Sequence, residues 1–235
     1  MPIIPDPLQN RILAALAPLE QASLFPMLEP VAMPAGWVVC EPGSDFDGLY
    51  FPTSGIVSTL YVMENGSAAE TAVIGNDGMV GISLFMGGQS TTSRAIVQHA
   101  GHAYRLRAHA LKAEFALGGT LQYLALRYAQ SLLTQMAQTT VCNRHHRLDQ
   151  QLCRWLLLRL DLLPDQTLLM TQEQIANTLG VRREAVTEAA GRLQSEGLIS
   201  YSRGRISLLD RAGLEQRVCE CYAVVQQEYR RLLPA

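Results

Sequence analysis

The residues whose types and spacing could do chemistry lie between positions 171 and 205 of the 235-residue chain. Arg182 and Arg183 open a segment with helical spacing, and Arg203 and Arg205 flank a glycine turn. Arginine can pair with two acceptors of guanine at once, and glutamate, present here as Glu184, can accept a hydrogen bond from the amino group of cytosine. Arginines at an exposed turn can neutralise phosphates. The chemistry that this segment predicts is recognition of double-stranded DNA.

The elements that must position these side chains follow one another along the same segment. Thr171 and Gln174 form the capping box of a helix over 172–178, and Gly180 supplies a tight turn. A second helix is expected over about 182–195, followed by two short strands at 198–201 and 205–208 with a hairpin turn between them. This order predicts a winged helix-turn-helix, whose second helix fits the major groove of DNA.

The side chains expected to contact DNA lie on the outward faces of these helices and on the hairpin. They are Thr171, Gln172, Arg182, Arg183, Glu184, Thr187, Glu188, Arg203 and Arg205. A helical domain that packs only against protein is the alternative interpretation. It leaves the outward arginines of both the second helix and the hairpin unexplained.

Composition and charge narrow the class of protein. Hydrophobic residues make up 48% and charged residues 17%, as in a folded globular chain. The net charge of −2 excludes a generally basic nucleic-acid coat, but residues 1–140 carry a net −4 and residues 141–235 a net +2. No apolar run is long enough to span a bilayer and no secretory signal opens the chain. We therefore expect a cytoplasmic protein without a membrane partner.

The rest of the chain indicates a roll and a long helix. Short β-type runs alternate with turn residues from about 28 to 106, which indicates a small antiparallel β-roll. A helix of about 23 residues follows over 120–142 and carries two apolar faces, so it needs two neighbours. The face expected to cover the roll comprises Leu121, Leu124, Ala125, Tyr128 and Leu132.

The second apolar face of this helix consists of Leu126, Ala129, Leu133 and Met136. We expect it to form the seam of a homodimer, and a neighbouring helix of the same chain is the alternative.

The expected roll and helices together give the fold class α+β. An N-terminal helix and β-roll occupy 1–119, a dimerisation helix and hinge 120–143, and the winged helix-turn-helix with a C-terminal helix 144–235.

The chain contains no pattern that is typical of catalysis or of a metal site. It lacks a nucleophile-and-base set, a glycine-rich phosphate loop and a His/Glu metal spacing, so we expect no enzyme activity. The five cysteines are expected to be reduced and buried. Cys219 and Cys221 lie in a helical pattern, where positions two apart point to nearly opposite sides, so a shared metal is not expected. His99 and His102 are interpreted as solvated loop residues, and no cofactor is predicted.

Three stretches carry a resemblance to the Crp-Fnr superfamily of bacterial transcription regulators: TQEQIA at 171–176, LGVRREAV at 179–186 and LxxxGLI at 193–199. The resemblance extends over nearly the whole chain and implies a homodimeric, sequence-specific DNA-binding regulator. It implies that Thr171 and Gln172 hold backbone phosphates and that Arg183 and Glu184 read a G·C pair. Glu188 stands where an arginine is common in the family, so the operator sequence does not transfer from better-known members.

The β-roll resembles the cyclic-nucleotide-binding fold of this superfamily, but its ligand residues differ. Members that bind cyclic AMP carry Gly-Glu where this chain has Gly81-Ile82-Ser83, and Arg-Ser/Thr-Ala where it has Ser93-Arg94-Ala95. Isoleucine cannot accept from a ribose hydroxyl, and an arginine displaced by one strand position faces the other way. We therefore expect an effector pocket near Gly81, Ile82, Ser83, Ser93 and Arg94 that has lost cyclic AMP.

The chain lacks residues that ligate the other sensing cofactors of the superfamily. Residues 1–39 contain no cysteine for an iron–sulfur cluster, and haem would need a histidine in 81–85 as well as Pro2. The expected partners are a palindromic double-stranded DNA operator, a second copy of the chain, RNA polymerase and an unidentified small-molecule effector. A small-molecule-binding or protein-interaction module without DNA activity is the alternative function.

Overall fold

The structure is a computed structural model that describes residues 5–233, so Pro2 lies outside the described residues. It begins with four short helical segments, η1 (Pro7–Gln9), α1 (Arg11–Ala14), α2 (Pro18–Leu24) and η2 (Phe25–Met27). Asn10 caps α1, because its side-chain oxygen accepts from the amides of Ile12 and Leu13. Its amide nitrogen donates to the carbonyls of Pro52 and Gly78. These bonds attach the N-terminal segment to the roll.

The predicted antiparallel roll is confirmed. Its strands in the described chain are β1 (Leu28–Met33), β2 (Val38–Cys40), β3 (Gly48–Pro52), β4 (Ile56–Val62), β5 (Ala68–Ile74), β6 (Arg94–His99) and β7 (Gly101–Arg107), with a short turn η3 (Ile82–Leu84) before β6. They form two sheets in the orders β1-β7-β3 and β2-β6-β4-β5. The sequence pattern does not predict β1, because Pro30 interrupts it. The strand lies at the edge of its sheet, where a proline is tolerated.

A short helix α3 (Ala108–Leu117) leads to the long helix α4 (Thr120–His145). The first apolar face of α4 is buried against the roll, as predicted. The second face differs from the prediction, because Ala129 is also buried and Met136 packs against the roll core. The large apolar side chains that α4 exposes are instead Tyr123, Leu126, Leu133 and Val141.

The C-terminal part contains the predicted helix-turn-helix and hairpin. Its elements are α5 (Leu148–Leu160), β8 (Thr167–Leu169), α6 (Gln172–Leu179), α7 (Arg183–Ser195), β9 (Ile199–Ser202), β10 (Arg205–Leu208), α8 (Arg211–Arg217) and α9 (Glu220–Leu232). The strands form an antiparallel sheet in the order β8-β10-β9. The added strand β8 has three residues, which is too short to show an alternating pattern. Leu156, Ile175 and Val186 lie in the shared core of α5, α6 and α7.

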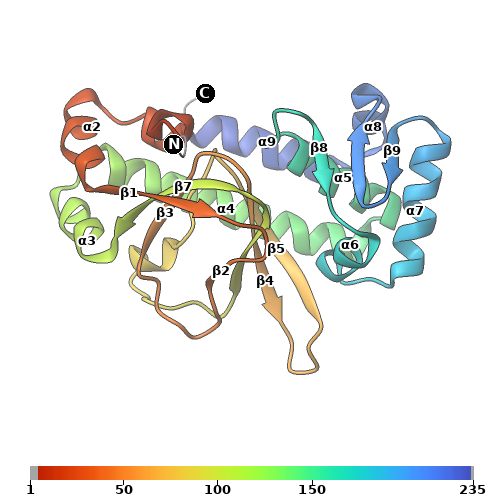
Figure 1. Cartoon of the computed structure of the whole chain (residues 1–235), viewed down its shortest axis with the longest axis horizontal. Coiled ribbons are helices and arrows are strands. Elements are labelled where there is room, and N and C mark those ends of the chain that lie inside the picture. Colours follow the sequence, from red (N-terminus) through yellow and green to blue (C-terminus); the bar gives the residue numbers. More distant parts are fainter. Residues whose placement is uncertain (1–4, 234–235) are drawn as a thin grey trace.

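Helix α4 joins the two parts of the molecule, since only His146 and Arg147 separate it from α5 (Figure 1). Helix α9 returns along α4, where Arg127 donates to the Arg231 carbonyl at 2.7 Å. Helix α6 lies against β5 of the roll. None of the described helices combines the length and the apolar character needed to cross a membrane.

A buried ion pair connects the roll to the C-terminal part. Glu70 on β5 accepts hydrogen bonds from the Arg159 guanidinium of α5 and from the Ser58 hydroxyl of β4. Arg159 is fully buried, and its guanidinium carbon lies 3.8 Å from the centroid of the Trp155 ring. Burial lowers the pKa of Arg159, and the charge of Glu70 acts in the opposite direction. Because an unpaired buried charge is costly, this pair fixes α5 on β5.

The start of α9 corrects one expectation from the sequence. The helix begins at Glu220, and Cys219 precedes it with an extended backbone at φ −75° and ψ 164°. Cys219 and Cys221 therefore do not follow helical spacing. Their sulfur atoms lie together, within 4.8 Å of ligand atoms of Cys142 and His146. The prediction that the two thiols point apart is wrong.

Candidate nucleic-acid interface

The first turn of α6 is fixed by the predicted capping box. The Thr171 hydroxyl accepts from the backbone amide of Gln174 at 3.2 Å, and the Gln174 side chain accepts from the Thr171 amide at 2.8 Å. Ile175 and Ala176 are buried and hold the helix on its core. Thr171 and the neighbouring Gln172 therefore lie at a well-defined helix N-terminus, where backbone amides favour an anion such as a phosphate.

Helix α7 is set at a fixed angle to α6 by a glycine turn. Gly180 has a φ of 68°, in the left-handed region that glycine adopts without strain. One face of α7 is buried through Val186, Ala189, Ala190 and Leu193. Its other face and its first turn expose Arg182, Arg183 and Glu184. This is the arrangement that a recognition helix needs, with an apolar side on the core and long polar side chains at its N-terminal end.

The wing is the hairpin of β9 and β10, whose strands are connected by a two-residue turn. Arg203 and Gly204 form the turn with φ of 49° and 77°. Two consecutive left-handed residues are typical of a type I′ turn, whose twist matches that of the strands. The Tyr201 hydroxyl donates to the Met170 carbonyl at 2.8 Å and so fixes the wing beside the start of α6. Burial raises the pKa of Tyr201, which keeps this donor protonated.

A cleft of about 420 Å³ lies between α6, α7 and the wing. Its lining residues are Thr171, Gln172, Glu173, Arg183, Tyr201, Arg203 and Gly204. Four of the side chains nominated from the sequence are therefore brought together here, although they come from three elements. The remaining nominated side chains are exposed on the same elements outside the cleft: Arg182, Glu184, Thr187, Glu188 and Arg205.

Apart from Gly204 of the turn, two lining residues lie outside the set nominated from the sequence, Glu173 and Tyr201. The Glu173 carboxylate repels phosphate, and tyrosine is common in β-strands, so neither residue type indicates DNA binding. A signal that could have found Tyr201 is its position two residues before Arg203 on the same hairpin.

A further contact links α6 and α7, because the Thr187 hydroxyl donates to the Gln172 side chain at 2.7 Å.

Glu188, the residue that departs from the family pattern, has a partner within the protein. Its carboxylate forms an ion pair with Arg192, four residues later, at 2.5 Å. Arg192 also pairs with Asp149 of α5 at 2.6 Å. Both hydrogen bonds raise the pKa of Arg192, the one to Asp149 more than the one to Glu188. Glu188 thus shares Arg192 with Asp149. The Glu188 side chain is 73% exposed, so its carboxylate is accessible from solvent.

The pocket nominated in the roll is present but small. A cavity of about 100 Å³ is lined by Gly81, Ile82, Ser83 and Ser93 together with Leu132 and Met136 of α4. The buried Ser83 hydroxyl has no hydrogen-bond partner among the described residues. Arg94 does not reach this cavity and instead forms an ion pair with Glu41 at 2.8 Å. Arg94 therefore faces away from the pocket, in line with its displacement by one strand position.

A larger cavity lies outside the roll interior, where α9 meets α5 and the segment after β5. Its volume is about 660 Å³, and its polar lining residues include Asp77, Asp161, Arg211 and Tyr222. Asp161 ion-pairs with Arg211 at 2.6 Å and accepts from the Tyr222 hydroxyl at 2.8 Å. Asp161, Arg211 and Tyr222 therefore satisfy one another on the wall of this cavity.

Two family models match the chain. The cyclic nucleotide-binding domain matches residues 30–116, and the Crp-like helix-turn-helix domain matches residues 150–217. The first lies on the roll and the second on the part that contains α6, α7 and the wing. A search of curated proteins found no match.

Solved structures agree with these two matches. A CRP/FNR-family transcriptional regulator from Thermus thermophilus is 26% identical, with 80% of this chain and 97% of that chain covered and a TM-score of 0.62. A protein from Eubacterium rectale assigned to the Crp/Fnr family of transcriptional regulators is 21% identical, with coverage of 90% and 97% and a TM-score of 0.68. FixK2 from Bradyrhizobium japonicum is 14% identical, with coverage of 82% and 98% and a TM-score of 0.68. The likeness thus extends over both parts of the chain in one arrangement.

Proposed function

The chain belongs to the Crp/Fnr family of transcriptional regulators, and from this premise we propose that it works as a homodimer whose two winged helices bind a palindromic operator. It is a DNA-binding regulator with a cyclic-nucleotide-binding-like domain. We keep the division into a sensor part at 1–119, a dimerisation helix and hinge at 120–143 and a DNA-binding part at 144–235. Contact with RNA polymerase is a prediction that rests on the family likeness alone.

The observation that carries the proposed DNA contacts is the cleft between α6, α7 and the wing. It brings two arginines from different elements, Arg183 and Arg203, to one surface with the N-terminus of α6. We assign Arg183 to a base edge, because it opens the recognition helix and can pair with guanine at two atoms. We assign Arg203 to a phosphate, because the wing tip lies to the side of the groove that α7 would enter.

The proposed dimer rests on the exposed apolar residues of α4. Leu126 and Leu133 are seven residues apart and are 53% and 55% exposed, and Tyr123 is 57% exposed. A seven-residue spacing places side chains on one face, as in a helix pair. Two recognition helices related by a two-fold axis would then read half-sites about one helical turn, or roughly 34 Å, apart.

We further propose that the roll does not bind cyclic AMP. The cavity at Ile82 and Ser93 is about 100 Å³, whereas small-molecule sites enclose roughly 300–1,000 Å³. Leu132 and Met136 of α4 occupy its inner wall. The site therefore lacks room as well as the acidic and basic side chains that a cyclic nucleotide needs.

The DNA contacts are tested by titration with a fluorescent operator, selected from random DNA by the wild-type protein, and with a scrambled duplex. Arg183→Ala should weaken operator binding by about 1–3 kcal/mol and relax the preference at one base pair. Arg203→Asn keeps the left-handed turn, since asparagine tolerates that conformation. It should weaken both duplexes equally and lower the salt dependence by about one unit per subunit.

Arg107→Ala is the matched control, because Arg107 is a surface arginine of the roll, where it pairs with Glu29. It should change neither duplex affinity. If Arg183→Ala weakens both duplexes equally while Arg203→Asn changes the base preference, the two assigned roles are reversed. If neither substitution matters, the cleft is not the DNA surface. If the wild-type protein enriches no sequence from random DNA, a module without DNA activity becomes the better interpretation.

A further inference from the structure

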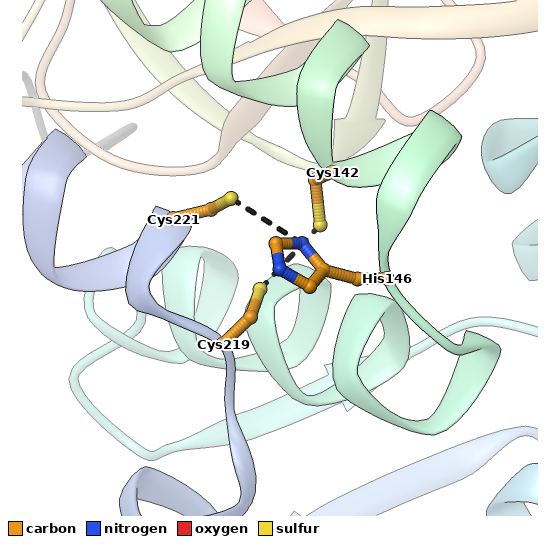
Figure 2. A group of neighbouring side chains, drawn as sticks. All are labelled: Cys142, His146, Cys219 and Cys221. Atoms are coloured by element: carbon orange, nitrogen blue, oxygen red, sulfur yellow. Dashed lines mark hydrogen bonds between the residues drawn. The ribbon is translucent and has the colours of Figure 1, made fainter.

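Four side chains capable of binding a metal converge at the joint between α4 and the C-terminal part. Cys142 lies in the last turn of α4 and His146 directly follows that helix, while Cys219 and Cys221 come from the start of α9 (Figure 2). The three cysteines are buried, and the side chain of His146 is 15% exposed. The cluster lies outside the DNA cleft and outside the roll cavity.

Local structure explains why residues so far apart in the chain meet here. His146 caps the end of α4, and its backbone amide donates to the Cys142 carbonyl at 3.1 Å, which holds the two residues together at this helix end. Cys219 has an extended backbone as the cap of α9 and Cys221 lies in its first turn, which turns both sulfurs toward α4. Each helix end therefore supplies two donors.

The donor separations fit one tetrahedral metal ion. The sulfurs of Cys142 and Cys219 are 3.6 Å apart, and the Cys221 sulfur lies 3.5 Å from Nδ1 of His146. All four donors lie within 4.8 Å of one another. A tetrahedral ion with metal–sulfur distances of about 2.3 Å and metal–nitrogen distances of about 2.0–2.1 Å has donor–donor edges of about 3.6–3.8 Å. An iron–sulfur cluster spreads its ligands over several irons and would hold them farther apart.

The surroundings provide what a thiolate-rich site needs. Glu220 lies 3.4 Å from Nε2 of His146, the ring nitrogen that faces away from Cys221. A carboxylate in this position orients a metal-bound histidine and fixes its tautomer. Three thiolates around a divalent ion leave one net negative charge. The buried Arg154, whose charge acts on Cys142 and Cys221, supplies the compensating positive charge.

We propose that Cys142, His146, Cys219 and Cys221 bind a single Zn²⁺ ion that joins the end of α4 to the start of α9. Soft thiolates with one imidazole in a tetrahedral arrangement select Zn²⁺, and four protein ligands leave no open position for a substrate. The site is therefore structural rather than catalytic. It fixes the joint where α4 passes into α5, and its binding free energy becomes folding free energy at that point.

The first test measures metal in the full-length protein without an affinity tag, purified anaerobically with a thiol reductant and supplied with Zn²⁺. Elemental analysis should find one zinc per chain in the wild type and less than a tenth of that in Cys142→Ser and Cys219→Ser. Cys40→Ser is the matched control, because Cys40 is a buried cysteine of the roll outside the cluster. It should retain one zinc per chain.

The second test separates loss of a ligand from loss of folding. Replacing zinc by Co²⁺ should give the visible bands of a tetrahedral cobalt site and thiolate-to-cobalt charge transfer in the near ultraviolet. Cys221→His keeps four donors, so it should still bind one Co²⁺ per chain with the charge-transfer intensity reduced by about a third, since one of three thiolates is lost. Circular dichroism of each variant reports whether it remains folded.

Several results would overturn the proposal. One is a wild-type protein that stays metal-free after incubation with Zn²⁺ and Co²⁺ although its thiols titrate as reduced. A second is equal zinc in the wild type, Cys142→Ser and Cys219→Ser. A brown protein with iron and acid-labile sulfide would show a cluster in place of a single ion, and a Cys142–Cys219 disulfide under reducing conditions would show that the cluster is a redox pair.

Discussion

Removing the Glu70 carboxylate should destabilise the protein more than removing any surface charge. Glu70→Gln leaves the fully buried guanidinium of Arg159 without an anionic partner among the described residues. Its remaining contacts there are the Trp155 ring and a 3.3 Å hydrogen bond to the Trp155 carbonyl. Breaking a buried pair in this way costs about 3–5 kcal/mol. Because single domains have a total stability of roughly 5–15 kcal/mol, a loss of this size is readily measured.

The assay is urea unfolding followed by circular dichroism, with tryptophan fluorescence as a second probe. Trp155 lies beside Arg159, so its fluorescence reports directly on this contact. The matched control is Glu41→Gln, which breaks the exposed pair between Glu41 and Arg94. That change should cost less than about 1 kcal/mol, since an exposed pair gains little from its Coulomb energy.

A double variant tests the physical reason. In Glu70→Gln with Arg159→Met the buried charge is gone, so most of the lost stability should return. The reasoning is refuted if Glu70→Gln costs no more than Glu41→Gln. It is also refuted if the double variant is as unstable as the single one, because the cost would then come from packing rather than from an unpaired charge.

The remaining predictions concern assembly, ligand binding and the wing. Leu126→Glu with Leu133→Glu should give monomers by light scattering at micromolar concentration, whereas Leu19→Glu, at a residue of α2 that is 86% exposed, should not; a wild-type monomer would contradict the proposed seam. Calorimetry with cyclic AMP should show no binding in the micromolar range, and Ile82→Glu alone should not create it, because the cavity of about 100 Å³ stays too small. Arg203→Gly relieves the left-handed conformation of a non-glycine residue, so urea unfolding should show stability unchanged or higher by up to about 1 kcal/mol while DNA binding weakens. A stability loss above that margin would show that the Arg203 side chain supports the fold.

The winged helix could be predicted from the sequence because its signals are local. Thr171 and Gln174 are three residues apart, Gly180 marks the turn, and the hairpin turn at 202–204 lies between two short strands. Each signal is satisfied by residues close in the chain, so no tertiary contact is needed to read it. The same holds for the roll, whose turns separate short β-type runs.

The features that the sequence does not predict depend on residues far apart. Glu70 and Arg159 are 89 positions apart, and neither residue type signals burial. The prediction that the Cys219 and Cys221 thiols point apart is wrong for a more specific reason. The helical pattern places Cys219 within the helix, whereas it is the cap with an extended backbone, and a helix boundary displaced by one residue changes the direction of its side chain.

The proposed dimer face shows a third kind of limit. Periodicity correctly finds that α4 has two apolar sides, but it does not say how far the roll wraps around the helix. Ala129 is buried and Met136 packs against the roll core as well, which leaves Leu126 and Leu133 as the exposed part of the second face. A residue on the border between two faces is assigned only by the tertiary structure.

The contacts between the two parts restrict how a signal could pass from the roll to the DNA. The Gln135 side chain of α4 is bound to both backbone groups of Val73 on β5, at 2.6 and 3.2 Å, and Glu70 on the same strand holds Arg159 of α5. Rotating α5 away from β5 would separate that arginine from its partner, which costs about 3–5 kcal/mol where the guanidinium stays buried. If a zinc ion also holds α9 to the end of α4, the joint between α4 and α5 would be restrained both by the Glu70–Arg159 pair and by the metal. A change in the roll would therefore reach α7 by moving β5, α4 and α5 together, as one body against the second subunit of the proposed dimer, rather than by bending at the hinge predicted at the end of 120–143.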